Sequence, residues 1–143
     1  MFHPKAIFRI IGFLLLFEAL SLLSCIPVAL YYGEPTEYLL FSVAAMVVSG
    51  SFFAYVCRKA GRNVSRKDGY IVVTVIWIIF SLFGSLPYML SGYIPSFTDA
   101  FYETMSGFTT TGSSILSNIE SLPRSLLFWR ALTHWIGGLG IVF

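Results

Sequence analysis

Three consecutive threonines and a glycine, Thr109, Thr110, Thr111 and Gly112, lie between two apolar runs of the sequence. Carbonyl oxygens of such a run can replace the water shell of a cation when they point toward a common axis. Glycine accepts the positive φ that keeps successive carbonyls aligned, and the threonine side chains are expected to point back into the protein. We therefore expect these four residues to form a cation site through their backbone, and the sequence indicates no cofactor.

The composition indicates that this run lies in a membrane. Hydrophobic residues make up 57% of the 143 residues and charged residues only 11%, whereas soluble domains carry about 25% charged residues. Charged residues are absent from 38–57 and from 69–98, and a membrane-spanning helix needs roughly 20 mainly apolar residues. The chain is therefore predicted to be an all-α integral membrane protein.

Proline, glycine and charged residues divide the chain into four apolar helices. The first is predicted at about 4–32. Its apolar core is longer than the roughly 7–15 residues of a signal peptide, so a retained helix is favoured over a cleaved one. The others are predicted at about 36–58, 69–90 and 123–143, and Pro87 is expected to bend the outer end of the third.

The basic residues indicate how these helices are oriented. One short connection contains five of them: Arg58, Lys59, Arg62, Arg66 and Lys67. Lys and Arg mark the cytoplasmic side, so the protein is predicted to be a multi-pass protein of the cell (inner) membrane with a cytoplasmic N-terminus. The net charge is +2 and no other basic patch is present. The lipid bilayer is therefore an expected partner and nucleic acid is not.

The stretch that contains the threonines is predicted to enter the membrane and return to the same side. Ser96 and Asp99 form an S-x-x-D capping box, and a helix over 97–107 is roughly 16 Å long, about half a membrane. The segment 109–113 would then lead back out. Irregular backbone is tolerated at this depth only where protein buries it or it lines a cavity, and the half-helix points its negative end at the membrane centre. The alternative is an amphipathic surface helix followed by a polar loop.

Several ionisable residues lie inside the apolar segments. Glu18 is costly in lipid and should face protein or a water-filled cavity. Glu103 and Arg130 are each other's best candidates for an ion pair. The alternative is an acidic entrance formed by Glu103 with Asp99, which lies four residues earlier. For His134, a hydrogen-bonded packing role is favoured over a proton relay.

Small residues complete the apolar segments. Cys25 and Cys57 are expected to act as small apolar residues, with no disulfide or metal site. Gly137, Gly138 and Gly140 are expected to let the last helix pack closely on its neighbours, in preference to acting as a gating hinge.

Four motifs together resemble the Trk/Ktr/HKT superfamily of potassium transporters, especially its Trk potassium-uptake membrane subunits. They are "SRKDGYIVV" at 65–73, "GSLPY" at 84–88, "TDAFYETMSGFTTTG" at 98–112 and "LFWRALTHWIGGLGI" at 127–141. They occur in the family's order and spacing. The resemblance implies two extra transmembrane helices with a basic cytoplasmic loop at 1–64 and a first pore repeat at 65–143.

The resemblance also implies a function. Thr109, Thr110, Thr111 and Gly112 would be the first of four selectivity-filter segments, with carbonyls that coordinate transported K⁺. A glycine at the position of Gly112 goes with potassium in this family. Members form homodimers and bind a cytoplasmic nucleotide-binding regulatory subunit.

One departure from the family leaves alternatives open. The family has four pore repeats in one chain, and this sequence has one. It is expected to be the N-terminal piece of a longer transporter, a truncated and inactive product, or, least favoured, a subunit that must tetramerise. The competing function is a non-conducting membrane interaction subunit. An enzyme is not expected, because the sequence offers no catalytic set of side chains.

Overall fold

Helices form most of the described part of the chain. The computed structural model describes residues 4–58 and 66–142. In chain order the elements are α1 (Pro4–Leu23), α2 (Cys25–Tyr32), α3 (Glu37–Val56), α4 (Arg66–Gly84), α5 (Leu86–Leu90), α6 (Phe97–Phe108), the 3-10 turn η1 (Ile119–Ser121) and α7 (Arg124–Val142). The described residues contain no strand, so the predicted all-α class is confirmed.

The span predicted as one helix at 4–32 is interrupted once. α1 ends at Leu23 and α2 begins at Cys25. Pro27 explains the interruption, because proline offers no N–H to the carbonyl four residues earlier and its ring crowds that carbonyl. The predicted bounds agree with the span Pro4–Tyr32, and the interruption at Ser24 was not predicted. The bend predicted near Pro87 is confirmed, since α4 ends at Gly84 and α5 begins at Leu86.

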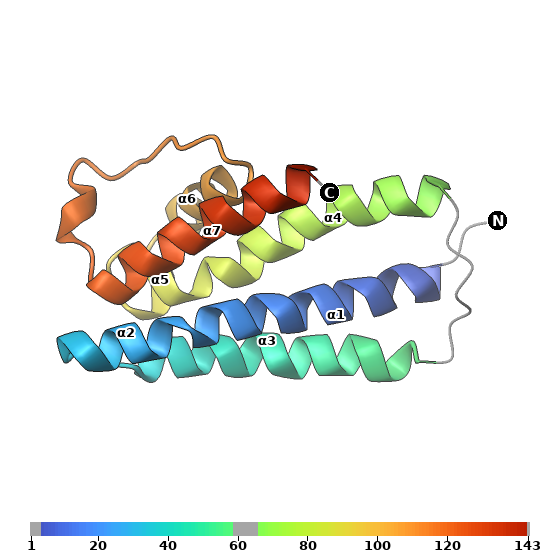
Figure 1. Ribbon diagram of the computed structural model, residues 1–143, viewed down its shortest axis with the longest axis horizontal. Helices are drawn as coiled ribbons and strands as arrows, with labels where there is room; N and C mark the ends of the chain where they lie inside the picture. The colour runs from blue at the N-terminus through green and yellow to red at the C-terminus, as the bar shows by residue number, and fades with distance from the viewer. Residues whose placement is uncertain (1–3, 59–65, 143) are drawn as a thin grey trace.

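The first layer of the fold is the antiparallel pair of α1 and α3, which lie side by side (Figure 1). Two glycines face each other where these helices cross. A Cβ on Gly12 would lie 2.8 Å from the carbonyl oxygen of Gly50, and a Cβ on Gly50 would lie 3.0 Å from that of Gly12. Small residues at such a crossing let two backbones approach closely.

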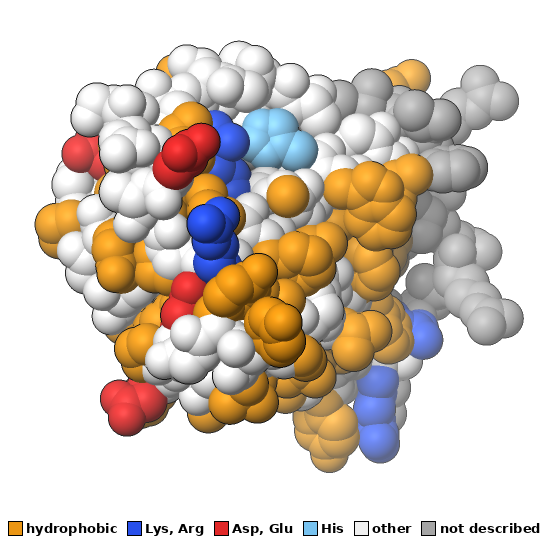
Figure 2. Space-filling view, turned by 60° about the vertical axis from the view of Figure 1, so that its left-hand side comes forward, with side chains coloured by type: hydrophobic (Ala, Val, Ile, Leu, Met, Phe, Trp, Pro, Cys, Tyr) orange, Lys and Arg blue, Asp and Glu red, His pale blue; other side chains and the backbone are white. Residues whose placement is uncertain are grey.

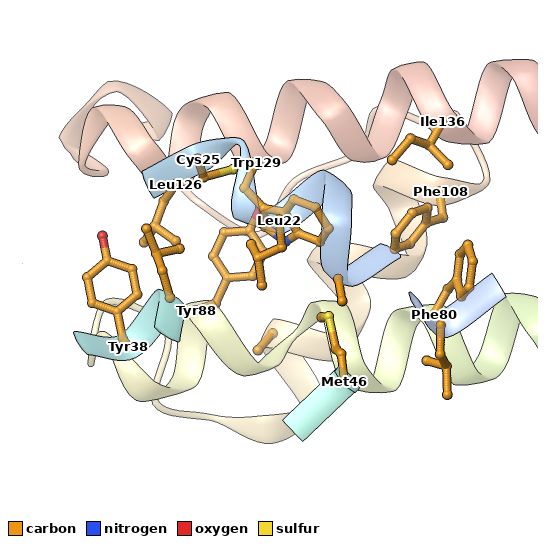
Figure 3. Close-up of a cluster of buried hydrophobic side chains, with 14 of the residues drawn as sticks. Leu22, Cys25, Tyr38, Met46, Phe80, Tyr88, Phe108, Leu126, Trp129 and Ile136 are labelled. Atoms are coloured by element: carbon orange, nitrogen blue, oxygen red, sulfur yellow. The ribbon is translucent and has the colours of Figure 1, made fainter. Parts of the chain in front are cut away.

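The second layer contains α4 to α7, and a core of large side chains joins it to the first (Figure 3). Trp129 of α7 and Tyr88 of α5 are almost fully buried in this core, together with Leu22 of α1 and Met46 of α3. The indole Nε1 of Trp129 donates a hydrogen bond of 3.0 Å to the carbonyl oxygen of Gly84, at the break between α4 and α5. The core therefore positions α7 against the site at which α4 ends.

Three spans of the described chain are long and apolar enough to cross a membrane: Pro4–Tyr32, Glu37–Val56 and Asp68–Leu90. Their outer surfaces are apolar as well, and Phe41, Val48 and Phe52 of α3 are 61–69% exposed. In Figure 2, hydrophobic side chains gather over the lower and right-hand parts of the described face, and charged side chains lie among and around them. The helices therefore belong to a membrane protein. α7 is not among these spans, so its crossing of the membrane stays a prediction.

The predicted orientation depends on a connection that the structure covers only in part. Residues 59–65 lie outside the described residues, as do the side chains of Arg66 and Lys67.

The two cysteines, Cys25 and Cys57, are both buried and free.

Candidate functional site

α6 and the segment after it follow the predicted path. In Figure 1, α6 runs only part of the way along the bundle, and the chain then returns to the end at which α5 and α7 begin. Ser96 stands at the N-cap with φ −74° and ψ 123°, but its side chain makes no capping hydrogen bond. The predicted capping box is therefore wrong in its side-chain contact. The position of the cap is right.

The C-terminal end of α6 is seated directly on α7. A Cβ on Gly137 would collide with the carbonyl group of Phe108, and one on Gly107 would collide with the Thr133 hydroxyl. The close packing predicted for the glycines of α7 is confirmed at Gly137. Gly138 differs, because its nearest neighbour would be Thr110 Cγ2 at 3.9 Å, which is ordinary contact.

A buried carboxylate holds α6 to α7 and to the returning segment. Glu103 is 1% exposed, and its Oε1 accepts a 2.7 Å bond from Arg130 Nε, so the predicted ion pair is confirmed. The hydroxyl of Ser114 lies 3.0 and 2.9 Å from the two carboxylate oxygens, and the backbone N–H of Ile115 donates to Oε2 at 3.2 Å. Glu103 is buried and paired, so it does not share an entrance with Asp99. Asp99 is exposed, and the attraction of cations by Asp99 alone stays a prediction.

Two further side chains of α6 hold the start of the returning segment. Ser106 Oγ donates to the carbonyl oxygen of Ser113 at 2.5 Å. The Tyr102 hydroxyl donates to Ser113 Oγ at 2.9 Å. Ser106, Ser113 and Ser114 were not among the predicted site residues. The available signal was a set of small hydroxyl residues beside the threonine run in an otherwise apolar region.

The backbone of the threonine run is asymmetric in its hydrogen bonding. The N–H of Thr110 donates to Gly107 O at 2.9 Å, and those of Thr111 and Gly112 donate to Ser106 O at 2.9 and 3.4 Å. Within the described chain, the carbonyl oxygens of residues 109–112 accept no hydrogen bond. The donors of this run therefore point at the end of α6, and its acceptors remain available.

The run turns and does not continue as an extended segment. Thr110 has φ 57° and Gly112 has φ 74°, whereas Thr109 has φ −79°. The N–H bonds back to α6 impose this turn. A positive φ was expected for glycine. For Thr110 no sequence signal predicts it, because β-branched residues rarely adopt such values.

The threonine hydroxyls contact the run itself and the helix before it. Thr109 Oγ1 donates to Met105 O at 2.7 Å and shares a 2.8 Å hydrogen bond with Thr111 Oγ1. Of the three threonine side chains in this described segment, that of Thr109 alone bonds to α6, and the expectation that all three point into the protein stays a prediction. All four residues from Thr109 to Gly112 are exposed on this chain. Carbonyl oxygens that accept no bond at an exposed surface can contact a cation from one side.

The remaining predicted residues take up packing positions. Nδ1 of His134 lies 2.9 Å from the carbonyl oxygen of Arg130, as the packing prediction requires. Glu18 is fully buried among protein atoms, which agrees with its predicted inward orientation. No group of three or more His, Cys, Asp or Glu side chains suited to a metal ion occurs in the described ranges.

Comparison with known proteins identifies the family. The family model of TrkH, described as a cation transport protein, matches residues 36–143. The chain belongs to the TrkH family. The match covers α3 and all the helices that follow it, including α6.

Relatives of the TrkH family match nearly the whole chain. The Trk system potassium uptake protein TrkG of Escherichia coli K12 is 33% identical over 143 residues, which cover 98% of this chain and 29% of that protein. The Trk system potassium uptake protein TrkH of Halomonas elongata is 34% identical over 140 residues, which cover 96% of this chain and 29% of that protein.

The fold is that of a solved TrkH protein. The crystal structure of the potassium transporter TrkH from Vibrio parahaemolyticus superposes with a TM-score of 0.91 at 30% sequence identity, over 99% of this chain and 31% of that one. The predicted fold class is therefore confirmed. The chain spans less than a third of the length of the relatives that it matches.

Proposed function

We propose that this chain serves potassium uptake across the cell membrane and that its residues 109–112 form one segment of a selectivity filter. The observation that carries the proposal is the hydrogen bonding of the backbone at residues 109–112. The N–H groups bond to the end of α6, and the carbonyl oxygens accept no bond within the described chain. Carbonyls in such a row can take the place of the water around K⁺. The names of the relatives, which are Trk potassium uptake proteins, support the same substrate.

One segment contacts an ion from one side only. We infer that the other segments belong to a longer transporter of which this chain is the N-terminal part. The relatives that it matches are more than three times as long. The partners that follow are K⁺, the lipid bilayer, a second copy of the transporter and a cytoplasmic nucleotide-binding regulatory subunit.

The proposed orientation follows from the basic connection between α3 and α4. Three of the five Lys and Arg residues lie in that connection and two at the start of α4, and such a cluster favours the cytoplasmic side. α1 then starts on the cytoplasmic side of the cell (inner) membrane, and α6 enters the membrane from the outer side. This direction points the C-terminal, negative end of the α6 dipole into the membrane, where it favours a cation.

A substitution at Gly112 tests the filter proposal. A Cβ at this position meets no atom within 4 Å, so Gly112→Ser acts through the backbone and not through a collision. A side chain at positive φ costs about 1–2 kcal/mol, and relief of this strain turns a carbonyl away from the row. We expect Gly112→Ser in the full-length protein to reduce the discrimination of K⁺ over Na⁺. The assays are potassium-limited growth of an uptake-deficient host and Rb⁺ uptake with competing Na⁺.

Two further variants control this test. Gly33 has φ 68° and also has no atom within 4 Å of a built Cβ, but it ends α2. Gly33→Ser therefore carries the same backbone strain outside the filter and should leave selectivity unchanged. Thr110→Ser keeps the hydroxyl and should change uptake much less than Gly112→Ser.

The opposite pattern of results favours the alternative function. A non-conducting interaction subunit would tolerate Gly112→Ser with no change in uptake. Abolition of uptake by Thr110→Ser, with Gly112→Ser silent, would show that threonine side chains and not carbonyls matter.

A further inference from the structure

Glu18 lies at the centre of the first membrane span. The span Pro4–Tyr32 has 29 residues, so 14 precede Glu18 and 14 follow it. At 1.5 Å per residue the carboxyl group is roughly 21 Å from either end of the span. Its exposed fraction is 0% within this chain alone.

Neither carboxyl oxygen of Glu18 has a hydrogen-bond partner in the described chain. The other buried or half-buried titratable groups on the neighbouring helices are Cys25 on α2, Tyr38 on α3, Asp68 on α4, Tyr88 on α5, Glu103 on α6, and Arg130 and His134 on α7. None of them bonds to Glu18 or pairs with it. The cation among them that lies within the membrane, Arg130, is paired with Glu103.

The carboxyl group occupies a place that a glycine leaves open beside α6. Three side-chain atoms converge on the position that a Cβ of Gly84 would take: Thr104 Cγ2 at 2.8 Å, Glu18 Oε1 at 3.0 Å and Phe108 Cε2 at 3.1 Å. Thr104 and Phe108 belong to α6, the helix that ends at the threonine run. Glu18 of α1 therefore reaches the end of α4, at a point that two side chains of α6 also approach.

An isolated ionised carboxylate is not stable in such a place. Transfer of a lone carboxylate into a low-dielectric interior is so costly that the group normally takes up a proton instead. A neutral carboxylic acid removes most of this cost. We propose that Glu18 is a proton-binding site, at which the acid form holds α1 against the end of α4. This function is additional to the filter, and its test below does not depend on transport.

The sign of the pH dependence follows from proton counting. When the helices separate, water reaches Glu18 and the acid releases its proton at neutral pH. The packed state thus binds one more proton than the separated state, and its stability falls as the pH rises. Alkaline conditions should weaken the contact of α1 with α4.

Infrared spectroscopy of the full-length protein in lipid vesicles tests the site directly. We expect the wild-type protein at neutral pH to show the C=O stretch of a protonated carboxylic acid, and we expect this band to be lost in Glu18→Gln. Glu120 is an exposed acid of η1, and Glu120→Gln should leave the band intact. The proposal is overturned if the band is missing from the wild-type protein or survives in Glu18→Gln.

Thermal unfolding of the same protein provides a second measurement. The melting temperature of the wild-type protein should fall from neutral to alkaline pH by more than that of Glu18→Gln. Glu18→Met fills a similar volume without a titratable group. It shows whether an effect of Glu18→Gln comes from the loss of the carboxyl group or from the introduced amide. Both variants should fold with wild-type yield. The proposal is overturned if Glu18→Gln and Glu18→Met both lose folded yield and their melting temperatures still depend on pH as that of the wild-type protein does. Glu18 would then be an ionised group with a partner and not a proton-binding site.

Discussion

Removal of one partner of the pair Glu103 and Arg130 should destabilise the pore unit strongly. Glu103 is 1% exposed, and the Arg130 side chain is 17% exposed. Arg130→Gln leaves a buried carboxylate without its cation, which costs about 3–5 kcal/mol. Glu103→Gln leaves the better hydrated guanidinium, and its main cost is one or two weakened hydrogen bonds, about 1–3 kcal/mol. Arg130→Gln should therefore be the more damaging of the two.

A double-mutant cycle measures the coupling within this pair. The free energy of unfolding of the full-length protein is obtained in mixed micelles for the wild type, both single variants and the double variant. Residues in direct contact couple by about 0.5–3 kcal/mol, so the double variant should recover part of the summed losses. Glu120→Gln and Arg124→Gln remove the same two charges at exposed positions. This control pair should show no measurable loss and no coupling.

Two outcomes would refute the argument. Strictly additive losses for Glu103→Gln and Arg130→Gln would mean that the pair does not act as a unit. A larger loss for Glu103→Gln than for Arg130→Gln would mean that the hydrogen bonds from Ser114 and Ile115, and not the guanidinium, carry most of the stabilisation. Ser114→Ala separates these cases, because it removes a hydroxyl bonded to both carboxylate oxygens and keeps the ion pair.

Two further predictions concern α7 and the orientation. Gly137→Ala should lower folded yield and uptake because its Cβ would collide with the Phe108 carbonyl, whereas Gly138→Ala should be tolerated because its Cβ meets no atom closer than 3.9 Å; equal damage by both would argue against close packing of α6. In a background with Cys25 and Cys57 replaced by alanine, a cysteine at Arg62 should react with an impermeant thiol reagent only from the cytoplasmic side. One at Glu37, an exposed residue at the start of α3, should react only from outside, and the reverse pattern would contradict the proposed topology.

Much of the fold could be predicted because the solvent imposes simple rules on composition. The charge-free run at 38–57 overlaps α3, and the run at 69–98 overlaps α4 and α5. Pro87 correctly predicted a break, but the same rule applied to Pro27 would have predicted the break at Ser24. That miss came from an incomplete use of a known signal and not from missing information.

Contacts within the site were harder to predict because they depend on three-dimensional approach. The pairing of Glu103 with Arg130 followed from the cost of a lone charge in a membrane, which needs no coordinates. The positive φ of Thr110 and the approach of Glu18 to Gly84 have no such sequence rule. They result from how α6 packs on α4 and α7 and how α1 packs on α4, and only the packed structure specifies that.

The strained conformation of Thr110 links the packing of α6 to the proposed filter. Thr110 is the one non-glycine residue with positive φ in the described ranges. Such conformations persist only where the surrounding structure imposes them. Before the run, Gly107 and Phe108 are seated on α7; after it, Ser113 and Ser114 are bonded to α6. Both ends of the run are therefore fixed by protein contacts, and the turn needs no ion to form. If the carbonyls of this run coordinate K⁺, they are held in place beforehand, so that binding costs little conformational entropy.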